Sequence, residues 1–195
     1  MENKKIFLDF GTHKGEGLLE FFNNGTINET FEVHTFEACP DLDSLNEIKE
    51  KIKDMPNFPK NINFYNKVVW IEDGFILFNN RKDHASHIEN IGFSYFQDKE
   101  NFNTIKVESI DISEFINVFS ENTFIVCKMD IEGSEFSVLR HLVKTNSIKK
   151  INEIYIEFHP DRTNNGTLLE SDQTISILIQ EMKECNNNLQ VNLWH

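Results

Sequence analysis

The chain has 195 residues, a hydrophobic content of 39% and a formal net charge of −13 at pH 7. This length is enough to bury one core and too short for two domains of ordinary size, so we expect a single domain over residues 1–195. The negative charge disfavours a nucleic-acid partner, because phosphate backbones are held mainly by Lys and Arg side chains.

Strands and helices are expected to alternate along the chain, because apolar residues recur at helical spacing in some segments and form short strand-like runs in others. In chain order, the expected elements are a strand over 6–10, a helix over 15–25, a strand over 31–40, a helix over 41–55, a strand and a hairpin over 62–80, a loop or lid over 80–104, a helix over 110–119, a strand over 123–131, a helix over 134–144, a strand over 151–160, a helix over 171–185 and a strand over 189–194. Gly25 is the expected C-cap of the first helix, Ser113 is the expected N-cap of the 110–119 helix, and Asp73-Gly74 is the expected hairpin turn. This rhythm predicts an α/β fold with three layers, in which helices cover both faces of a doubly wound, mostly parallel sheet.

Other classes of protein are excluded by what the sequence lacks. No stretch approaches the roughly 20 apolar residues of a membrane span, and "MENKK" leads straight into a strand. We therefore expect a soluble, cytoplasmic protein without a signal peptide or transmembrane segment. The three cysteines are unclustered, which predicts neither a disulfide framework nor a thiolate metal site.

Glycines gather directly after the first expected strand, in "LDFGTHKGEG". Gly11, Gly15 and Gly17 let a ligand approach backbone amides with no Cβ in the way, at the strand ends where such sheets bind ligands. A pyrophosphate fingerprint beginning at Gly11 requires glycines at positions 13 and 16, and a P-loop requires Lys followed by Ser or Thr. Neither phosphate motif fits, and a tight turn without a ligand is the alternative.

Glu37 closes the second expected strand, in "HTFEACP". An acid at this place in a doubly wound fold accepts hydrogen bonds from both ribose hydroxyls, and a solvated strand end is the alternative. Together with Asp9 before the glycines, Glu37 indicates a nucleoside whose charge is not that of a phosphate. S-adenosylmethionine fits, because its ammonium and sulfonium groups are both positive.

A second polar group follows two later strands. Asp130 ends one of them, and Glu157 and His159, two residues apart on the next, share one face. Together they are a candidate base for a hydroxyl group or a candidate site for a divalent metal ion with hard ligands. The alternatives are a structural role for His159 and, for Lys128, an ion pair that only stabilises the fold.

Two histidines lie in the polar 80–104 segment, which is long enough to suggest a functional loop. His84 and His87 can reach an acceptor from such a loop. Solvated loop histidines are the alternative, because loops lie on the surface.

Five segments occur in the order and approximate spacing of one enzyme family: "FLDFGTHKGEG", "TFEACP", "ESIDISEFI", "CKMDIEGSEFSVLRHL" and "IYIEFHP". Over about residues 6–160 they resemble the FkbM-type methyltransferases, a branch of the class I, Rossmann-like enzymes that use S-adenosylmethionine. The most specific piece, "KMDIEGSEFSVL", is similar to that family's K-I-D-V-E-G-x-E-x-x-V-L. Where the family usually shows D-V-G-A-N-x-G, Thr12 and His13 replace Ala and Asn. The family's sheet ends with an antiparallel hairpin, whereas only "LQVNLW" follows the last helix here, so the sheet is one strand short or the chain is trimmed.

The resemblance implies O-methylation of a sugar, a glycan or another small hydroxyl compound, with S-adenosylmethionine as cofactor. The residues then expected to bind the cofactor are Asp9, Gly11, Thr12, His13, Gly15, Gly17, Glu37, Ala38, Val68, Val69 and Asp130. The residues expected to be catalytic are Asp130, Glu157 and His159, which are also the ligands of a divalent metal ion if one is used, and those expected to bind the acceptor are His84, Ser86 and His87. A methyltransferase acting on a protein or nucleic acid, and a cofactor-binding module without turnover, are the alternatives.

Overall fold

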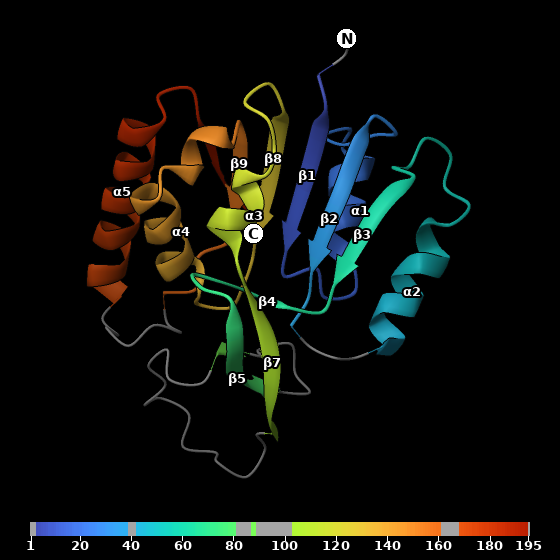
Figure 1. Ribbon diagram of the computed structural model, residues 1–195, viewed down its shortest axis with the longest axis horizontal. Coiled ribbons are helices and arrows are strands. Elements are labelled where there is room, and N and C mark those ends of the chain that lie inside the picture. Colours follow the sequence, from blue (N-terminus) through green and yellow to red (C-terminus); the bar gives the residue numbers. More distant parts are fainter. Residues whose placement is uncertain (1–2, 39–41, 81–86, 89–102, 161–167, 195) are drawn as a thin grey trace.

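The computed structural model describes residues 3–38, 42–80, 87–88, 103–160 and 168–194, which form two sheets and their covering helices (Figure 1). The strands are β1 (Lys5–Phe10), β2 (Phe31–Phe36), β3 (Asn61–Tyr65), β4 (Val68–Trp70), β5 (Gly74–Asn80), β6 (His87–Ile88), β7 (Asn103–Asp111), β8 (Phe124–Met129), β9 (Glu153–Ile156) and β10 (Gln190–Leu193). The helices are α1 (Glu16–Asn23), α2 (Leu42–Ile52), α3 (Ile112–Asn117), α4 (Glu135–Lys144), the 3-10 helix η2 (Ser147–Lys150) and α5 (Leu168–Cys185). Among the helices of the described residues, none has the length and apolar character needed to cross a membrane.

The larger sheet has the strand order β10-β9-β8-β1-β2-β3, and all its neighbouring strands run parallel. Alternate residues of β1 face opposite sides of this sheet. Leu8 packs in the core cluster that contains Leu139 of α4, whereas Phe7 packs with Phe21 of α1, their ring centroids 5.2 Å apart. Helices α3, α4 and α5 cover the first face, and α1 and α2 cover the second. The predicted three-layer, doubly wound fold is confirmed, and no antiparallel strand joins the six described strands of this sheet.

The direction of winding reverses between β1 and β8. The chain runs outward from β1 through β2 to β3, and later returns to the other side of β1 to form β8, β9 and β10. Such a switch point is where open α/β sheets bind ligands, at the carboxyl ends of the strands. Gly11 and Asp130 come directly after the two strands on either side of it.

The smaller sheet, of order β4-β7-β5-β6, lies beyond the arrowheads of β1, β2 and β3 in Figure 1. The predicted hairpin through Asp73-Gly74 is wrong, because β7 lies between β4 and β5. Ser109 of β7 is paired with Val68 on one side and with Gly74 on the other. The Asp73 carboxylate accepts a hydrogen bond from the Asp111 backbone N–H at 2.9 Å, which ties the turn to the end of β7.

Two expected helix ends shift by one or two residues. The N-cap of α3 is Asp111 and not Ser113, because the Asp111 carboxylate accepts hydrogen bonds from the backbone N–H groups of Ser113 and Glu114, at 2.8 and 3.3 Å. The C-cap of α1 is Asn24, and Gly25 follows it with a φ of +82°. In the predicted loop over 80–104, Asn80 ends β5, His87–Ile88 form β6, and β7 begins at Asn103. Residues 81–86 and 89–102 lie outside the described residues.

Candidate active site

The turn after β1 is packed tightly against the end of β8. Gly11 has a φ of +78°, and a Cβ added to it would lie 1.7 Å from the carbonyl oxygen of Asp130, so only glycine fits there. Its N–H donates to the carbonyl oxygen of Phe36 in β2 at 3.0 Å. Gly15, with a φ of +76°, is the N-cap of α1, and a Cβ there would meet a side chain of α2 at 2.8 Å. The neighbouring strands and helix α2 therefore determine the shape of this turn.

A buried ion pair lies beneath the turn. Asp9 and Lys128 are register partners on β1 and β8, and their side chains are 0% and 2% exposed. The Lys128 Nζ lies 3.5 Å from Asp9 Oδ1 and 3.4 Å from Asp130 Oδ2, and it donates to the Gly11 carbonyl oxygen at 2.6 Å. The Thr12 hydroxyl donates to the other Asp9 oxygen. Asp9 was expected to contact the cofactor, and in the structure it stabilises the turn through Thr12 and Lys128. Lys128 forms the structural ion pair that was the alternative for it.

The charges of this pair depend on one another. Burial raises the pKa of Asp9 above its ordinary value, although Lys128 and the Thr12 hydroxyl oppose the shift. Burial lowers the pKa of Lys128, but the carboxylates of Asp9 and Asp130 outweigh this effect, so that pKa lies above its ordinary value. The ammonium therefore stays charged at physiological pH and compensates a carboxylate that is wholly out of water.

Glu37 follows β2 and reaches back to the glycine turn. Its carboxylate accepts a hydrogen bond from the His13 backbone N–H at 2.7 Å. The side-chain amide of Asn66 donates to the carbonyl oxygens of Glu37 and Ala38, at 2.9 and 3.4 Å. The predicted residues His13, Glu37 and Ala38 therefore gather at one strand end. Asn66 was missed, because only the pairing of β2 with β3 brings it there.

The two valines expected to bind the cofactor point in opposite directions, as neighbours on a strand do. Val68 packs with Ala38 and Val107, whereas Val69 belongs to the main core. Of the two, Val68 is the one beside the end of β2.

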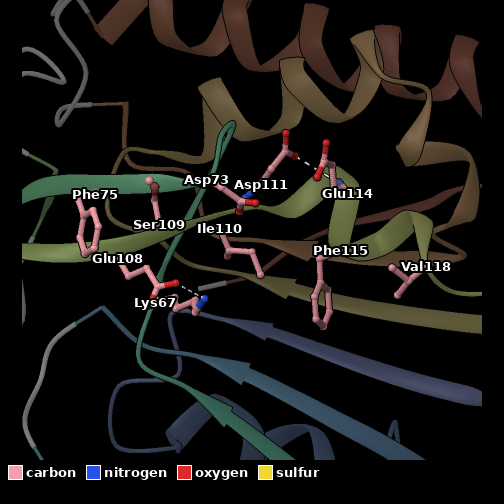
Figure 2. A pocket seen from close by; sticks show the side chains of 11 residues that line it. Lys67, Asp73, Phe75, Glu108, Ser109, Ile110, Asp111, Glu114, Phe115 and Val118 are labelled. Carbon is pink, nitrogen blue, oxygen red and sulfur yellow. Dashed lines mark hydrogen bonds and ion pairs between the residues drawn. The ribbon is translucent and has the colours of Figure 1, made fainter.

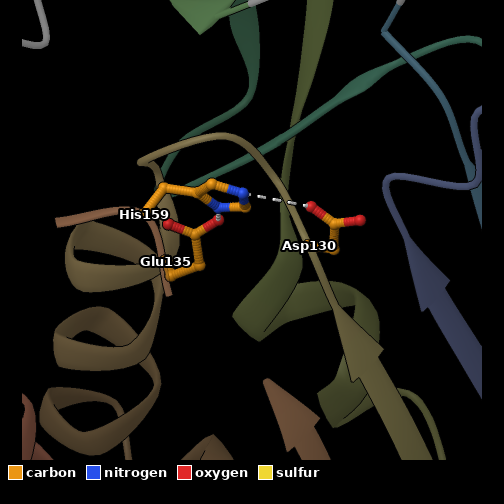
Figure 3. Close-up of side chains that lie close together, drawn as sticks. All are labelled: Asp130, Glu135 and His159. Carbon is orange, nitrogen blue, oxygen red and sulfur yellow. Dashed lines mark hydrogen bonds and ion pairs between the residues drawn. The ribbon is translucent and has the colours of Figure 1, made fainter. Parts of the chain in front are cut away.

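Carboxylates surround the imidazole of His159, whose residue is 9% exposed, just after β9 (Figure 3). Its Nδ1 lies 3.0 Å from Oε1 of Glu135. Its Nε2 lies 3.6 Å from Glu157, 3.7 Å from Glu132 and 3.8 Å from Asp130. The predicted Asp130, Glu157 and His159 thus come together, and Glu135 makes the shortest contact with the ring.

Glu135 is fully buried at the start of α4 and was missed by the sequence reasoning. Its Oε1 also accepts the Ile131 N–H and its Oε2 accepts the Gly133 N–H, both at 2.9 Å. These bonds hold a turn in which Glu132 and Gly133 both have positive φ, of 59° and 99°. A glutamate at the start of a helix, reaching back to preceding backbone N–H groups, is a capping pattern, and "DIEGSE" carries that signal.

The electrostatics of this cluster favour a charged histidine. Burial lowers the pKa of His159, but the hydrogen bond and charge of Glu135, helped by Asp130 and Glu157, outweigh it, so the pKa lies above its ordinary value. Asp130, Glu135 and His159 offer atoms within 4.8 Å of one another, which is compatible with a metal site. However, the Glu135 oxygens already accept backbone and imidazole hydrogen bonds, and an imidazolium has no lone pair for a metal. The donor set fits an ion-pair network, and the predicted metal alternative is not supported.

The expected acceptor contacts fall in the segment before β7. His84 and Ser86 lie outside the described residues, as does the side chain of His87. The backbone of His87 pairs with Asn79 in the small sheet. Their contact with an acceptor stays a prediction.

A separate hollow of about 450 Å³ lies beside α3 and the small sheet (Figure 2). It is lined by Lys67, Asp73, Gly74, Phe75, Glu108, Ser109, Ile110, Asp111, Glu114, Phe115 and Val118. None of these lining residues belongs to the glycine turn or to the cluster around His159. Lys67 forms an ion pair with Glu108 at 2.5 Å, so these charges already have structural partners.

Comparisons with known proteins agree with this architecture. Residues 9–189 match the family model described as the methyltransferase FkbM domain. The crystal structure of methyltransferase FkbM from Methylobacillus flagellatus KT is similar, with a TM-score of 0.51 and 20% sequence identity over 90% of this chain. The match covers 37% of the length of that protein. None of the curated proteins matches the chain. Because the family model spans both the glycine turn and the cluster around His159, the chain belongs to the FkbM family of methyltransferases.

Proposed function

We propose that this chain, as a single domain over residues 1–195, is an S-adenosylmethionine-dependent O-methyltransferase acting on a sugar, a glycan or another small hydroxyl compound. Family membership supports methyl transfer. One observation carries the rest: Asp130 touches the glycine turn through its backbone and faces His159 through its side chain. A cofactor held at the turn and an acceptor beside His159 would therefore meet over Asp130.

The residues around the turn fit the cofactor. Bound S-adenosylmethionine supplies an electrophilic methyl group on a positively charged sulfur. Gly11 and Gly15 keep side chains away from the backbone of the turn, and Glu37, beside it, offers carboxylate oxygens to the ribose hydroxyls. Val68 and Ala38 offer apolar surface next to Glu37 for the adenine ring.

His159 is the proposed general base. Its Nε2 accepts the proton of the acceptor hydroxyl while the acceptor oxygen bonds to the methyl carbon and the carbon–sulfur bond breaks. The products are a methyl ether, S-adenosylhomocysteine and the His159 imidazolium, which later releases its proton to water. Asp130 and Glu157, 3.8 and 3.6 Å from Nε2, stabilise the imidazolium as it forms. Such proton removal contributes about 10²–10⁴-fold to rate.

Transfer of a labelled methyl group tests the proposal. The protein is incubated with labelled S-adenosylmethionine and a panel of sugars and glycans, with and without a chelator. We expect label on a hydroxyl group of at least one compound, and equal transfer when the chelator is present. The Asp130→Asn, His159→Ala double variant should lose this transfer while binding the cofactor in calorimetry.

Three outcomes contradict the proposal in different ways. Absence of cofactor binding by the wild type overturns the cofactor assignment. Binding without transfer to any compound favours a module without turnover. Label on added protein or nucleic acid, and on no small hydroxyl compound, favours the other substrate classes.

A further inference from the structure

We infer that Glu135 is a positioning residue that holds the neutral His159 ring as its Nδ1–H tautomer, so that the Nε2 lone pair faces the acceptor. The inference rests on the proposed role of His159 as base. A neutral imidazole has one nitrogen that donates and one that accepts a hydrogen bond. The partner of one nitrogen therefore decides whether the other can take a proton.

Glu135 can only accept from this ring. Its carboxylate is fully buried, and Oε1 and Oε2 are fixed by the backbone N–H groups of Ile131 and Gly133 at 2.9 Å. Rotation away from the ring would break both of these bonds inside the core. Because an ionised carboxylate offers lone pairs and no proton, the imidazole nitrogen 3.0 Å from Oε1 must carry the hydrogen.

The opposite nitrogen has no equally close carboxylate among the described residues. Asp130 after β8, Glu132 in the turn and Glu157 after β9 approach Nε2 at 3.6–3.8 Å, beyond hydrogen-bonding length. These three groups act on the ring by charge, whereas Glu135 acts by charge and by direct hydrogen bonding. The two sides of the imidazole are therefore chemically different before an acceptor arrives.

Nitrogen NMR of the full chain tests the inference without any acceptor. Long-range proton–nitrogen correlations of the ¹⁵N-labelled protein distinguish protonated from unprotonated ring nitrogens. The signals of His159, one of seven histidines, are assigned by their loss in His159→Gln. Above the pKa of His159 we expect a protonated Nδ1 and an unprotonated Nε2. An Nε2–H tautomer in the wild type overturns the inference, so the result does not depend on the folding of any Glu135 variant.

Two variants separate the hydrogen bond at Nδ1 from the charge near Nε2. Glu135→Met removes both acceptor oxygens at a similar side-chain length, so we expect the preference for the Nδ1–H tautomer to be lost and turnover to fall by about 10²-fold or more. Glu157→Gln removes one negative charge 3.6 Å from Nε2 and leaves the Nδ1 contact intact, so the Nδ1–H tautomer should persist. If Glu135→Met keeps the wild-type tautomer, Glu135 does not select it and the inference is wrong.

The test also separates this inference from the proposed function. An Nδ1–H ring that depends on Glu135, in a protein that methylates nothing, supports the Glu135 assignment and contradicts the catalytic role of His159. Methyl transfer to a hydroxyl by a protein whose ring is the Nε2–H tautomer contradicts the Glu135 assignment and the role of His159 as base, and leaves the O-methyltransferase assignment standing.

Discussion

The carbonyl oxygen of Asp130 occupies the space that a side chain on Gly11 would need, 1.7 Å from the ideal Cβ position. This contact joins the turn after β1 to the end of β8, the two strands between which the winding reverses. The glycine turn and the cluster around His159 are therefore one packed unit, and a change on either side displaces the other.

Replacing Gly11 tests this packing directly. Gly11→Ala should lower the free energy of unfolding by about 2–6 kcal/mol, since strained backbone and overpacking each cost about 1–3 kcal/mol. Gly25→Ala is the matched control, because Gly25 has a similar φ of +82° and nothing within 4 Å of its ideal Cβ. Chemical denaturation of both variants gives the difference, and equal losses would show that Asp130 exerts no steric pressure on the turn.

Lys128 should be indispensable only while Asp9 carries a charge. Lys128→Met leaves a wholly buried carboxylate without compensation, which costs about 3–5 kcal/mol. Adding Asp9→Asn should recover most of this loss, and denaturation of the two single variants and the double variant measures the coupling.

The pH dependence of Lys128→Met gives a second check. Without the ammonium, the folded-state pKa of Asp9 rises further above its unfolded value, so the variant is relatively stable in acid and loses stability as pH rises. Lys67→Met is the control, because its partner Glu108 is half exposed and surface pairs contribute at most about 1 kcal/mol. If the Asp9→Asn, Lys128→Met double variant is no more stable than Lys128→Met, the ion pair between Asp9 and Lys128 is contradicted.

Glu37 should contribute to cofactor binding in two ways, by accepting hydrogen bonds from the ribose and by holding the glycine turn through the His13 N–H. We expect Glu37→Ala to weaken the binding of S-adenosylmethionine by about 1–3 kcal/mol, since it leaves hydrogen-bonding groups without partners. Calorimetry with S-adenosylmethionine and with NAD checks this. Unchanged affinity in Glu37→Ala would place the ribose away from Glu37. Tighter binding of NAD than of S-adenosylmethionine by the wild type would contradict the cofactor assignment.

The raised pKa of His159 predicts opposite pH trends for stability and activity. A group whose folded pKa exceeds its unfolded value stabilises fully below the unfolded value, about 6.5, and loses this contribution as pH rises through the folded value. Wild type should therefore exceed His159→Gln in stability most at acid pH. A base must be neutral, so turnover should rise as pH passes the raised pKa. Stability curves that stay parallel over this range would show that His159 holds no shifted proton.

Local patterns in the sequence predicted most of the elements, because apolar spacing reports which face of a helix or strand is buried. The glycine turn, Glu37 and the cluster of Asp130, Glu157 and His159 were also predictable, since parallel strand ends share one edge of a sheet. The failures involve partners that are distant in sequence. Insertion of β7 between β4 and β5 depends on pairing that no short window shows. The sequence around Glu135 does not show that its side chain contacts His159, which lies 24 positions later.

The hydrogen bond from Lys128 to the Gly11 carbonyl joins residues that are 117 positions apart, which has a consequence for how the protein folds. Contacts of such long range form late, because the intervening chain must first lose much of its conformational freedom. During synthesis, residues 11–17 emerge early, yet Asp9 has no cation to accompany it into the interior until β8 has been made. A newly made N-terminal half should therefore keep Asp9 in water and its glycine turn unformed. Cofactor affinity should appear only once β8 has docked beside β1, so retention on immobilised S-adenosylhomocysteine would report completed assembly of the sheet in a series of C-terminally shortened chains.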